Sequence, residues 1–151
     1  MKTNDEELWN EVQAAREEEK ALAAKLVWGE NPQATPEEAA LMIDAARNRA
    51  HRAGKPLGEV LQAPAFKGFD PGYARYQEVQ DFGPGHPHYD AIKRLVDLAY
   101  EPKRKPTSTD HYYATNSPRP GWADALTDVQ TQGEHTFGRH RTPRELGYPK
   151  K

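Results

Sequence analysis

The chain has no cysteine among its 151 residues. This absence excludes disulfides, catalysis by a thiol and zinc sites built from cysteine. Long apolar runs are also missing, and no segment approaches the roughly 20 apolar residues that a membrane-spanning helix needs. The only serines are Ser108 and Ser117, and neither lies in a nucleophile elbow. No phosphate-binding glycine loop or zincin-type histidine pair occurs, so the sequence predicts neither a metal site nor a cofactor.

The length favours one domain over residues 1–151. The net charge of -2 gives no indication of nucleic-acid binding. Acids gather in the first thirty residues, and the chain leans basic from Lys103 onward. That basic end could meet a polyanion, but a solvated surface is the favoured interpretation. Residues 1–7 are acidic without an apolar h-region, so we expect no signal peptide and synthesis in the cytoplasm; action outside the membrane would need delivery by another factor.

A first helix is predicted over residues 4–28. Gly29 suits the left-handed residue that closes a helix, and Pro32 blocks its continuation. Glu30 then lies directly after the helix, beside apolar bulk that disfavours the charged form of a carboxyl group. Glu30 is therefore a candidate proton donor, although spacing alone slightly favours a solvated carboxylate or a helix-end ion pair. The helix carries one stripe of mostly apolar residues: Leu8, Val12, Ala15, Glu19, Leu22 and Leu26.

A second helix has a clear start, because Thr35 is a cap, Pro36 is the first helical residue and Glu38 completes a capping box. It ends at Gly54. A short helical turn is expected at 57–61, a loop region rich in proline, glycine and aromatics at 62–88, and a third helix at about 87–100. Strands are expected at 111–115 and 136–141. The fold class is therefore α+β, mainly helical, with a small antiparallel sheet toward the C-terminus.

Aromatic and amide side chains in the loops suggest a sugar-binding groove, because rings stack on the apolar faces of sugars and amides bind their hydroxyl and acetamido groups. Filling the core is the usual alternative for such rings. Tyr112 and Tyr113 would point to opposite faces of a strand, so at most one of them faces a ligand. The candidate set is Trp28, Phe66, Phe69, Tyr112, Tyr113, Asn116 and Trp122.

Six short segments follow one another in an order that carries a family resemblance. They are Val27–Pro32, Ala45–Arg49, Leu61–Phe66, His111–Asn116, Trp122–Ala123 and Gly138–His140. Together they resemble the cell-wall hydrolase family that includes the spore-cortex-lytic enzymes. The corresponding family elements are Tyr-Gly-Glu-Ala-Arg-Gly-Glu, a helix ending in Asn-Arg, Gln-Pro-x-x-Phe, His-Tyr-Tyr, Trp-Ala and Gly-x-His. The resemblance covers about residues 22–141.

This resemblance implies a lysozyme-like fold with Glu30 as the catalytic acid, cutting peptidoglycan between N-acetylmuramic acid and N-acetylglucosamine. It also adds Asn48 and His140 to the expected substrate-binding residues. The chain departs from the family at Asn31–Ala34, which replaces the segment with the second family carboxylate. It departs again at Arg141-Thr142, where aromatic residues usually follow the final histidine.

The resemblance favours a lytic transglycosylase, which needs one carboxyl group. Hydrolysis by a retaining enzyme would need a second carboxylate about 5–5.5 Å away. Four acids stay open as that partner: Asp70, Asp81, Asp110 and Glu134. The expected partner is therefore the glycan strand of peptidoglycan, with no nucleic acid and no membrane span.

Another class stays open: a virion structural or adaptor protein that keeps the fold with weak or no activity and contacts other phage proteins. The first helix would then be a docking element. Action on the cell wall after phage-type release, or as a virion component, fits the expected lack of a signal peptide.

Overall fold

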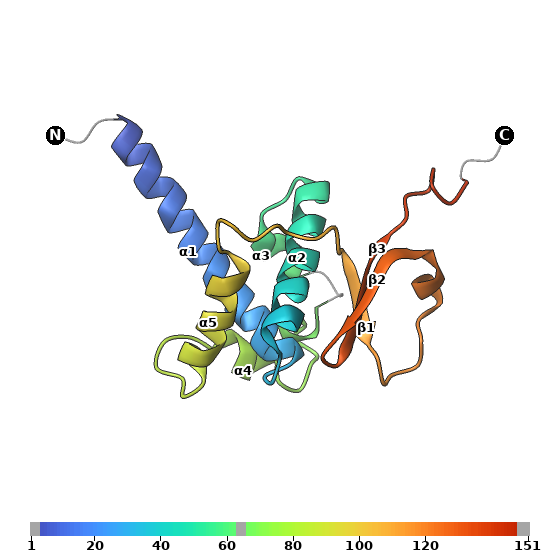
Figure 1. Ribbon diagram of the computed structural model, residues 1–151. Helices are drawn as coiled ribbons and strands as arrows, with labels where there is room; N and C mark the ends of the chain where they lie inside the picture. Colours follow the sequence, from blue (N-terminus) through green and yellow to red (C-terminus); the bar gives the residue numbers. More distant parts are fainter. Residues whose placement is uncertain (1–3, 63–65, 148–151) are drawn as a thin grey trace.

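A computed structural model describes residues 4–62 and 66–147 of the chain. The helices come first and gather on one side of the molecule, and a three-stranded antiparallel sheet follows on the other side (Figure 1). The predicted mainly helical α+β architecture is thus confirmed. Ala63-Pro64-Ala65, the centre of the Leu61–Phe66 segment, lies outside the described residues. The elements are α1 (Asn4–Glu30), α2 (Pro36–Ala53), α3 (Leu57–Leu61), α4 (Tyr76–Gln80), α5 (Tyr89–Ala99), β1 (His111–Ala114), β2 (Leu126–Gln132) and β3 (His135–His140), with 3-10 turns η1 (Lys67–Phe69) and η2 (Gly121–Ala125).

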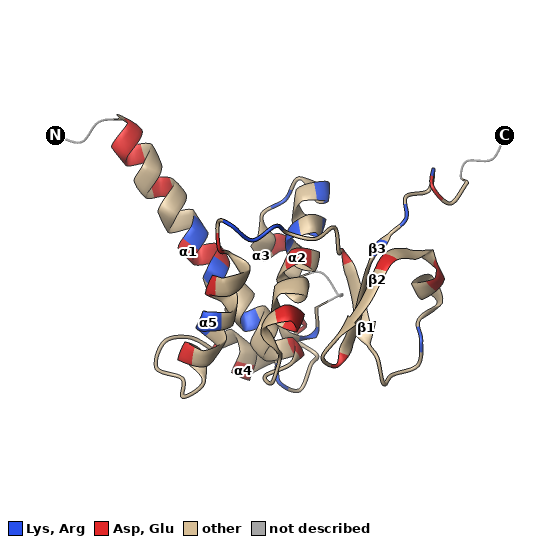
Figure 2. Cartoon of the chain, in the orientation of Figure 1, with Lys and Arg blue, Asp and Glu red and all other residues tan. Residues whose placement is uncertain are grey.

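Helix α1 is buried only in its C-terminal part, where the buried residues begin at Ala23. Its first half projects from the body of the protein and carries many of the acidic residues (Figures 1 and 2). Leu8, Trp9 and Val12 are exposed there. The apolar stripe that the sequence shows therefore reaches the core only at its C-terminal end.

The predicted end of α1 at Gly29 is wrong, because the helix runs through Gly29 and ends at Glu30. Gly29 has another role, which is to allow a close approach of two backbones. A Cβ atom there would lie 3.2 Å from Cγ2 of Val79 and 3.3 Å from Cα of Gly68. The missing side chain lets η1 and α4 pack directly against the last turn of α1.

Helix α2 begins as predicted, with the Thr35 side chain accepting a hydrogen bond from the Glu38 N–H and Pro36 in the first turn. It ends at Gly54, whose φ of 64° is the left-handed conformation of a helix cap. The second half of the predicted capping box is absent, because the Glu38 carboxylate turns away from the cap and is engaged elsewhere. In the loop region expected at 62–88, the structure contains η1 and the short helix α4.

The sheet has the strand order β1-β3-β2. Strands β1 and β3 confirm the two predicted strands within a residue or two, but β2 was missed. An irregularity in its register between Thr127 and Gln130, with Asp128 at a φ of 54°, breaks the alternation that would have revealed a strand. One face of the sheet packs on the helices, since Phe137 of β3 belongs to the same buried cluster as Leu26 of α1 and Met42 of α2. None of the helices described is long and apolar enough to cross a bilayer.

Candidate active site

Glu30 lies where the helices meet the sheet. It is the last residue of α1, and its surroundings come from η1, β1 and β3 through Lys67, Tyr112 and His135. The residue is partly exposed, whereas the four residues before it are buried. A carboxyl group at this position can therefore be reached from solvent while most of its environment is protein.

Burial raises the pKa of the Glu30 carboxyl above its usual range, because a charged carboxylate is poorly solvated there. Its place at the negative end of a helix of 27 residues acts in the same direction. Three neighbours oppose this effect: the charges of His135 and Lys67, and hydrogen bonding from Tyr112 and the Lys67 backbone. Glu30 is thus an acid that keeps its proton longer than an exposed glutamate, with cations and donors ready to stabilise the anion.

Tyr112 is the phenol beside this acid. Burial and the neighbouring Glu30 raise the pKa of Tyr112, so its hydroxyl keeps its proton. The hydroxyl is buried and has no partner at good hydrogen-bond geometry among the described residues, although it lies close enough to Glu30 to affect its pKa. The ring packs against Phe66 and, edge-on, against His135, with centroid distances of 6.4 and 5.4 Å. Tyr112 is therefore a buried, protonated phenol close to the Glu30 carboxyl group.

A second, fully buried carboxylate belongs to this site. Glu38 of α2 accepts hydrogen bonds from Asn31 Nδ2 at 2.7 Å, from the Glu134 N–H at 2.6 Å and from His135 Nδ1 at 2.9 Å. The tip of the β2–β3 hairpin has no side chain at this point, since a Cβ on Gly133 would lie 2.6 Å from the Glu38 carboxyl carbon. Glu38 thus connects the residue next to Glu30 with the hairpin.

The sequence interpretation missed both Glu38 and His135 as site residues. Glu38 looked like half of a capping box. His135 had no partner motif, yet it lies in a second Gly-x-His, Gly133-Glu134-His135, followed by the aromatic Phe137. The predicted Gly-x-His was the one that ends in His140. The aromatic residue two positions after His135 is the signal that could have drawn attention to this histidine.

The other acids considered as a second carboxylate have different places. Asp70 and Asp81 accept hydrogen bonds from the Gly72 N–H and from Gln77 within their own turns. Glu134 has an exposed side chain, and only its backbone N–H enters the site.

Asp110 is fully buried and serves as an anchor between elements. Its carboxylate accepts hydrogen bonds from His111 Nδ1 at 2.9 Å and the His140 N–H at 2.7 Å, and it pairs with Arg52. Burial alone would raise its pKa, but these donors lower the pKa of Asp110 to about 2. The carboxylate therefore holds the sheet to α2.

Several predicted substrate-binding rings lie in the core. Trp28 is buried, stacks on Phe82 with 4.7 Å between centroids, and donates its Nε1–H to Glu78. Phe66 and Phe69 are buried in the second core cluster. The structure thus places these rings where aromatic side chains usually lie, and no ring face is offered to a sugar.

Tyr112 and Tyr113 lie on opposite faces of the sheet, as the strand pattern predicts. On the face of the sheet opposite to Tyr112, the ring of Tyr113 packs against Trp122 with 5.8 Å between ring centroids. Trp122 also contacts the ring of His111. The ring centroids of His140 and His111 lie 5.1 Å apart. Both rings line a pocket of about 300 Å³, whose other lining residues are Arg52, Arg141, Thr142 and Pro143. The structure therefore does not bring Tyr113, Trp122 or His140 together with Glu30.

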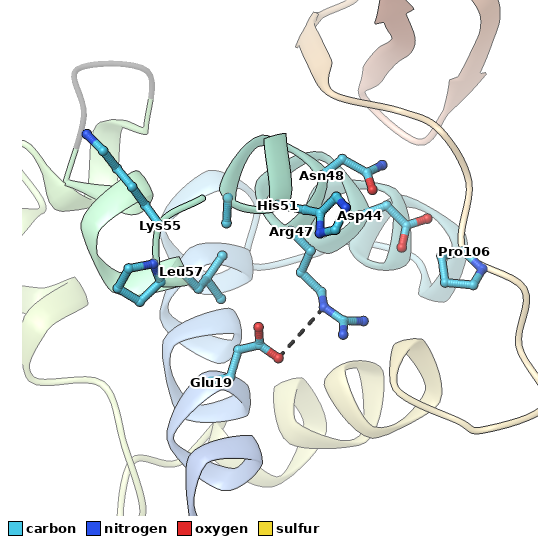
Figure 3. A pocket seen from close by; sticks show the side chains of 10 residues that line it. Glu19, Asp44, Arg47, Asn48, His51, Lys55, Leu57 and Pro106 are labelled. Atoms are coloured by element: carbon cyan, nitrogen blue, oxygen red, sulfur yellow. Dashed lines mark ion pairs between the residues drawn. The ribbon is translucent and has the colours of Figure 1, made fainter. Parts of the chain in front are cut away.

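The last two predicted binding residues are amides. Asn48 donates both protons of Nδ2, to the Thr107 and Thr109 carbonyls at 2.9 and 2.7 Å, so it positions the chain entering β1. It lines a pocket of about 460 Å³ between α1, α2 and the segment at Pro106, crossed by the Glu19–Arg47 ion pair (Figure 3). Glu30 does not line this pocket. Asn116 is exposed in the loop after β1.

In the described ranges, no three histidine, aspartate or glutamate side chains come together as metal ligands. Comparison with known proteins adds no relative: no family model, no curated protein and no solved structure matches this chain.

Proposed function

We propose that this protein cleaves the glycan of peptidoglycan between N-acetylmuramic acid and N-acetylglucosamine, as a lytic transglycosylase with Glu30 as its single general acid and base. The observation that carries the proposal is the partly exposed residue Glu30, whose carboxyl pKa is raised by burial and lowered in part by His135, Lys67 and Tyr112. A lysozyme-like fold, implied by the resemblance to the cell-wall hydrolases, belongs to the same proposal.

The chemistry needs one group that first gives and then takes a proton. Protonated Glu30 donates to the glycosidic oxygen while the bond to C1 of the muramic acid breaks, leaving an oxocarbenium-like sugar. The Glu30 carboxylate then takes the proton of the muramic acid 6-hydroxyl as its oxygen bonds to C1, which closes a 1,6-anhydro ring. A pKa raised toward neutrality suits both steps, because such a group can donate and accept.

The direct test is lysis of purified peptidoglycan by wild-type protein and Glu30→Gln, which keeps the shape of the side chain and removes the acid. We expect clearing by the wild type and a loss of at least about 100-fold in the variant. Asp70→Asn, in an exposed turn, is the matched control and should clear like the wild type. Equal clearing by Glu30→Gln would refute the assignment. Products with reducing ends, one water heavier than anhydro-muropeptides by mass spectrometry, would show hydrolysis instead.

A second candidate function is that of a virion structural or adaptor protein. The observation that favours it is the projecting half of α1, which exposes Leu8, Trp9 and Val12. A zymogram separates the two functions, since only an enzyme gives a clearing band. Absence of clearing by folded wild-type protein on several peptidoglycan types would favour the adaptor.

A further inference from the structure

Behind Glu30 lies a carboxylate–imidazole pair. The Glu38 carboxylate is completely buried, and His135 is buried with its Nδ1 2.9 Å from Oε2 of Glu38. A buried carboxylate is stabilised when donors or a cation surround it. Here two neutral donors, Asn31 Nδ2 and the Glu134 N–H, satisfy part of it, and the imidazole supplies the third contact.

The pair faces Glu30 from two directions. Asn31, the residue after Glu30, donates to Glu38, so the same carboxylate fixes the chain next to the acid. The His135 ring stands perpendicular to the Tyr112 ring at 5.4 Å, and Tyr112 in turn acts on Glu30. Because Nδ1 is directed at Glu38, the imidazole has a fixed orientation.

We propose that Glu38 and His135 are positioning residues of this site: Glu38 orients the imidazole beside Glu30, so that the carboxylate formed after proton donation meets an imidazole held in one orientation. The catalytic role of Glu38 and His135 rests on the proposed function. Their contact with each other does not, because it is present in the protein without substrate. The step would resemble other sites where a buried carboxylate orients a histidine toward a reacting group.

The other titratable groups near Glu30 come from each element packed against it. Lys67 of η1 is a cation and is exposed, so solvent weakens its effect. Tyr112 of β1 is a neutral donor, and Arg49 of α2 stabilises the Tyr112 anion instead of facing Glu30 directly. His135 is therefore the buried imidazole of the group, and the one held by a buried carboxylate.

The test is a titration of the Glu30 side-chain carboxyl by carbon-detected NMR in the free protein, for the wild type, His135→Gln and Glu38→Gln. Removal of the imidazole should move the Glu30 titration to higher pH in His135→Gln, because the effect of His135 that lowers the Glu30 pKa is lost, whereas Glu38→Gln keeps the imidazole and should give a different titration curve. His111→Gln is the matched control, because His111 has the same 2.9 Å contact from Nδ1 to a buried aspartate on the far face of the sheet. It should leave the Glu30 titration unmoved. No upward shift in a folded His135→Gln protein would overturn the proposal.

Glu30→Gln gives the reciprocal measurement if the buried variants do not fold. Two coupled groups shift each other equally, so removing the Glu30 charge should lower the pH at which His135 titrates, followed by its ring ¹⁵N shifts. The same spectra should show Nδ1 protonated in the neutral wild-type ring. An unchanged His135 titration would overturn the coupling.

Activity then separates this proposal from the proposed function. In His135→Gln, turnover on peptidoglycan should fall roughly tenfold or more, and the alkaline limb of kcat should move to higher pH, because Glu30 keeps its proton longer. A purely structural role would lower the rate without moving that limb. If no lysis occurs in any variant, the proposed function fails, but the NMR titrations still decide on the pair.

Discussion

Glu30 is placed at some cost to the folded protein, and that cost can be measured. A raised pKa means that ionisation is less favourable in the native state than in the unfolded state. At pH values below the unfolded pKa, near 4.5, the group is protonated in both states and costs nothing. As the pH rises through the folded pKa, the buried charge increasingly destabilises the protein.

We therefore predict that Glu30→Gln is more stable than the wild type at pH 7 to 8 and equally stable at about pH 4. In a chain of this length, each kcal/mol added to the free energy of unfolding raises Tm by about 2–4 °C. Thermal unfolding of both proteins across this pH range checks the prediction. The measured quantity is the stability of Glu30→Gln minus that of the wild type. If this difference were smaller at pH 8 than at pH 4, the sign of the Glu30 pKa shift would be contradicted.

Gly133 is the residue on which the Glu38 site depends most directly. Its φ of 59° disfavours any side chain, and a Cβ would clash with the Glu38 carboxylate. Gly54 is the matched control, with a φ of 64° and no atom within 4 Å of a built Cβ. Gly54→Ala should cost only the backbone strain, about 1–2 kcal/mol.

We predict that Gly133→Ala costs more than Gly54→Ala, by about 1–3 kcal/mol for disturbed buried hydrogen bonds. Urea unfolding of the two variants gives the difference. Equal costs would mean that the hairpin tip can move away from Glu38 freely.

Helix α1 shows how much of an element its own sequence can predict. Its heptad-like stripe correctly predicts a long helix, but the pattern is the same at Leu8 and at Leu26, and only the second is covered by the rest of the chain. The end of the helix was misplaced because glycine at a helix terminus usually signals the left-handed cap, whereas Gly29 serves a contact with Gly68 and Val79. Such contacts between distant segments leave no local signal.

The two leucines give a direct test within one helix. Leu8 is 60% exposed and Leu26 is 1% exposed. Leu26→Ala should destabilise the protein by about 2–5 kcal/mol, and Leu8→Ala by less than about 0.5 kcal/mol. Denaturant unfolding of both variants checks this. A large loss for Leu8→Ala would show that the projecting half is covered in solution.

At the level of the whole molecule, the helical part and the sheet are connected by buried polar groups as well as by the apolar core. Asp110 is one such link, since it joins Arg52 of α2 with His111 of β1 and His140 of β3. Because its pKa is lowered to about 2, it contributes stability that is full above the unfolded pKa near 3.8 and is lost as the pH falls toward 2.

We predict that Asp110→Asn destabilises the protein at neutral pH by about 1–3 kcal/mol, because the N–H partners and the exposed Arg52 lose a buried carboxylate. The difference from the wild type should shrink between about pH 4 and pH 2. Urea unfolding at several pH values measures both effects. A difference that stays constant down to pH 2 would contradict the role of the ionised carboxylate.

The sequence predicted the mainly helical α+β fold class better than it predicted the surroundings of Glu30. Periodicity, caps and strand patterns act locally, and they predicted α2, α5, β1 and β3 well. The Glu38–His135 contact joins residues 97 positions apart, and no local pattern indicates that these two residues meet. Asn48 and Trp28 matched family motifs, yet the structure gives them partners within the protein.

The projecting half of α1 also sets the distance between the N-terminal end of this helix and Glu30. Since the residues from Asn4 to Glu18 are almost all exposed, whole turns could be inserted or removed there without repacking the core. Each added turn would move anything fused to the N-terminus by about 5.4 Å and keep its direction after a full turn. The distance between an attached cargo and Glu30 can thus be set in steps by the number of helical turns alone.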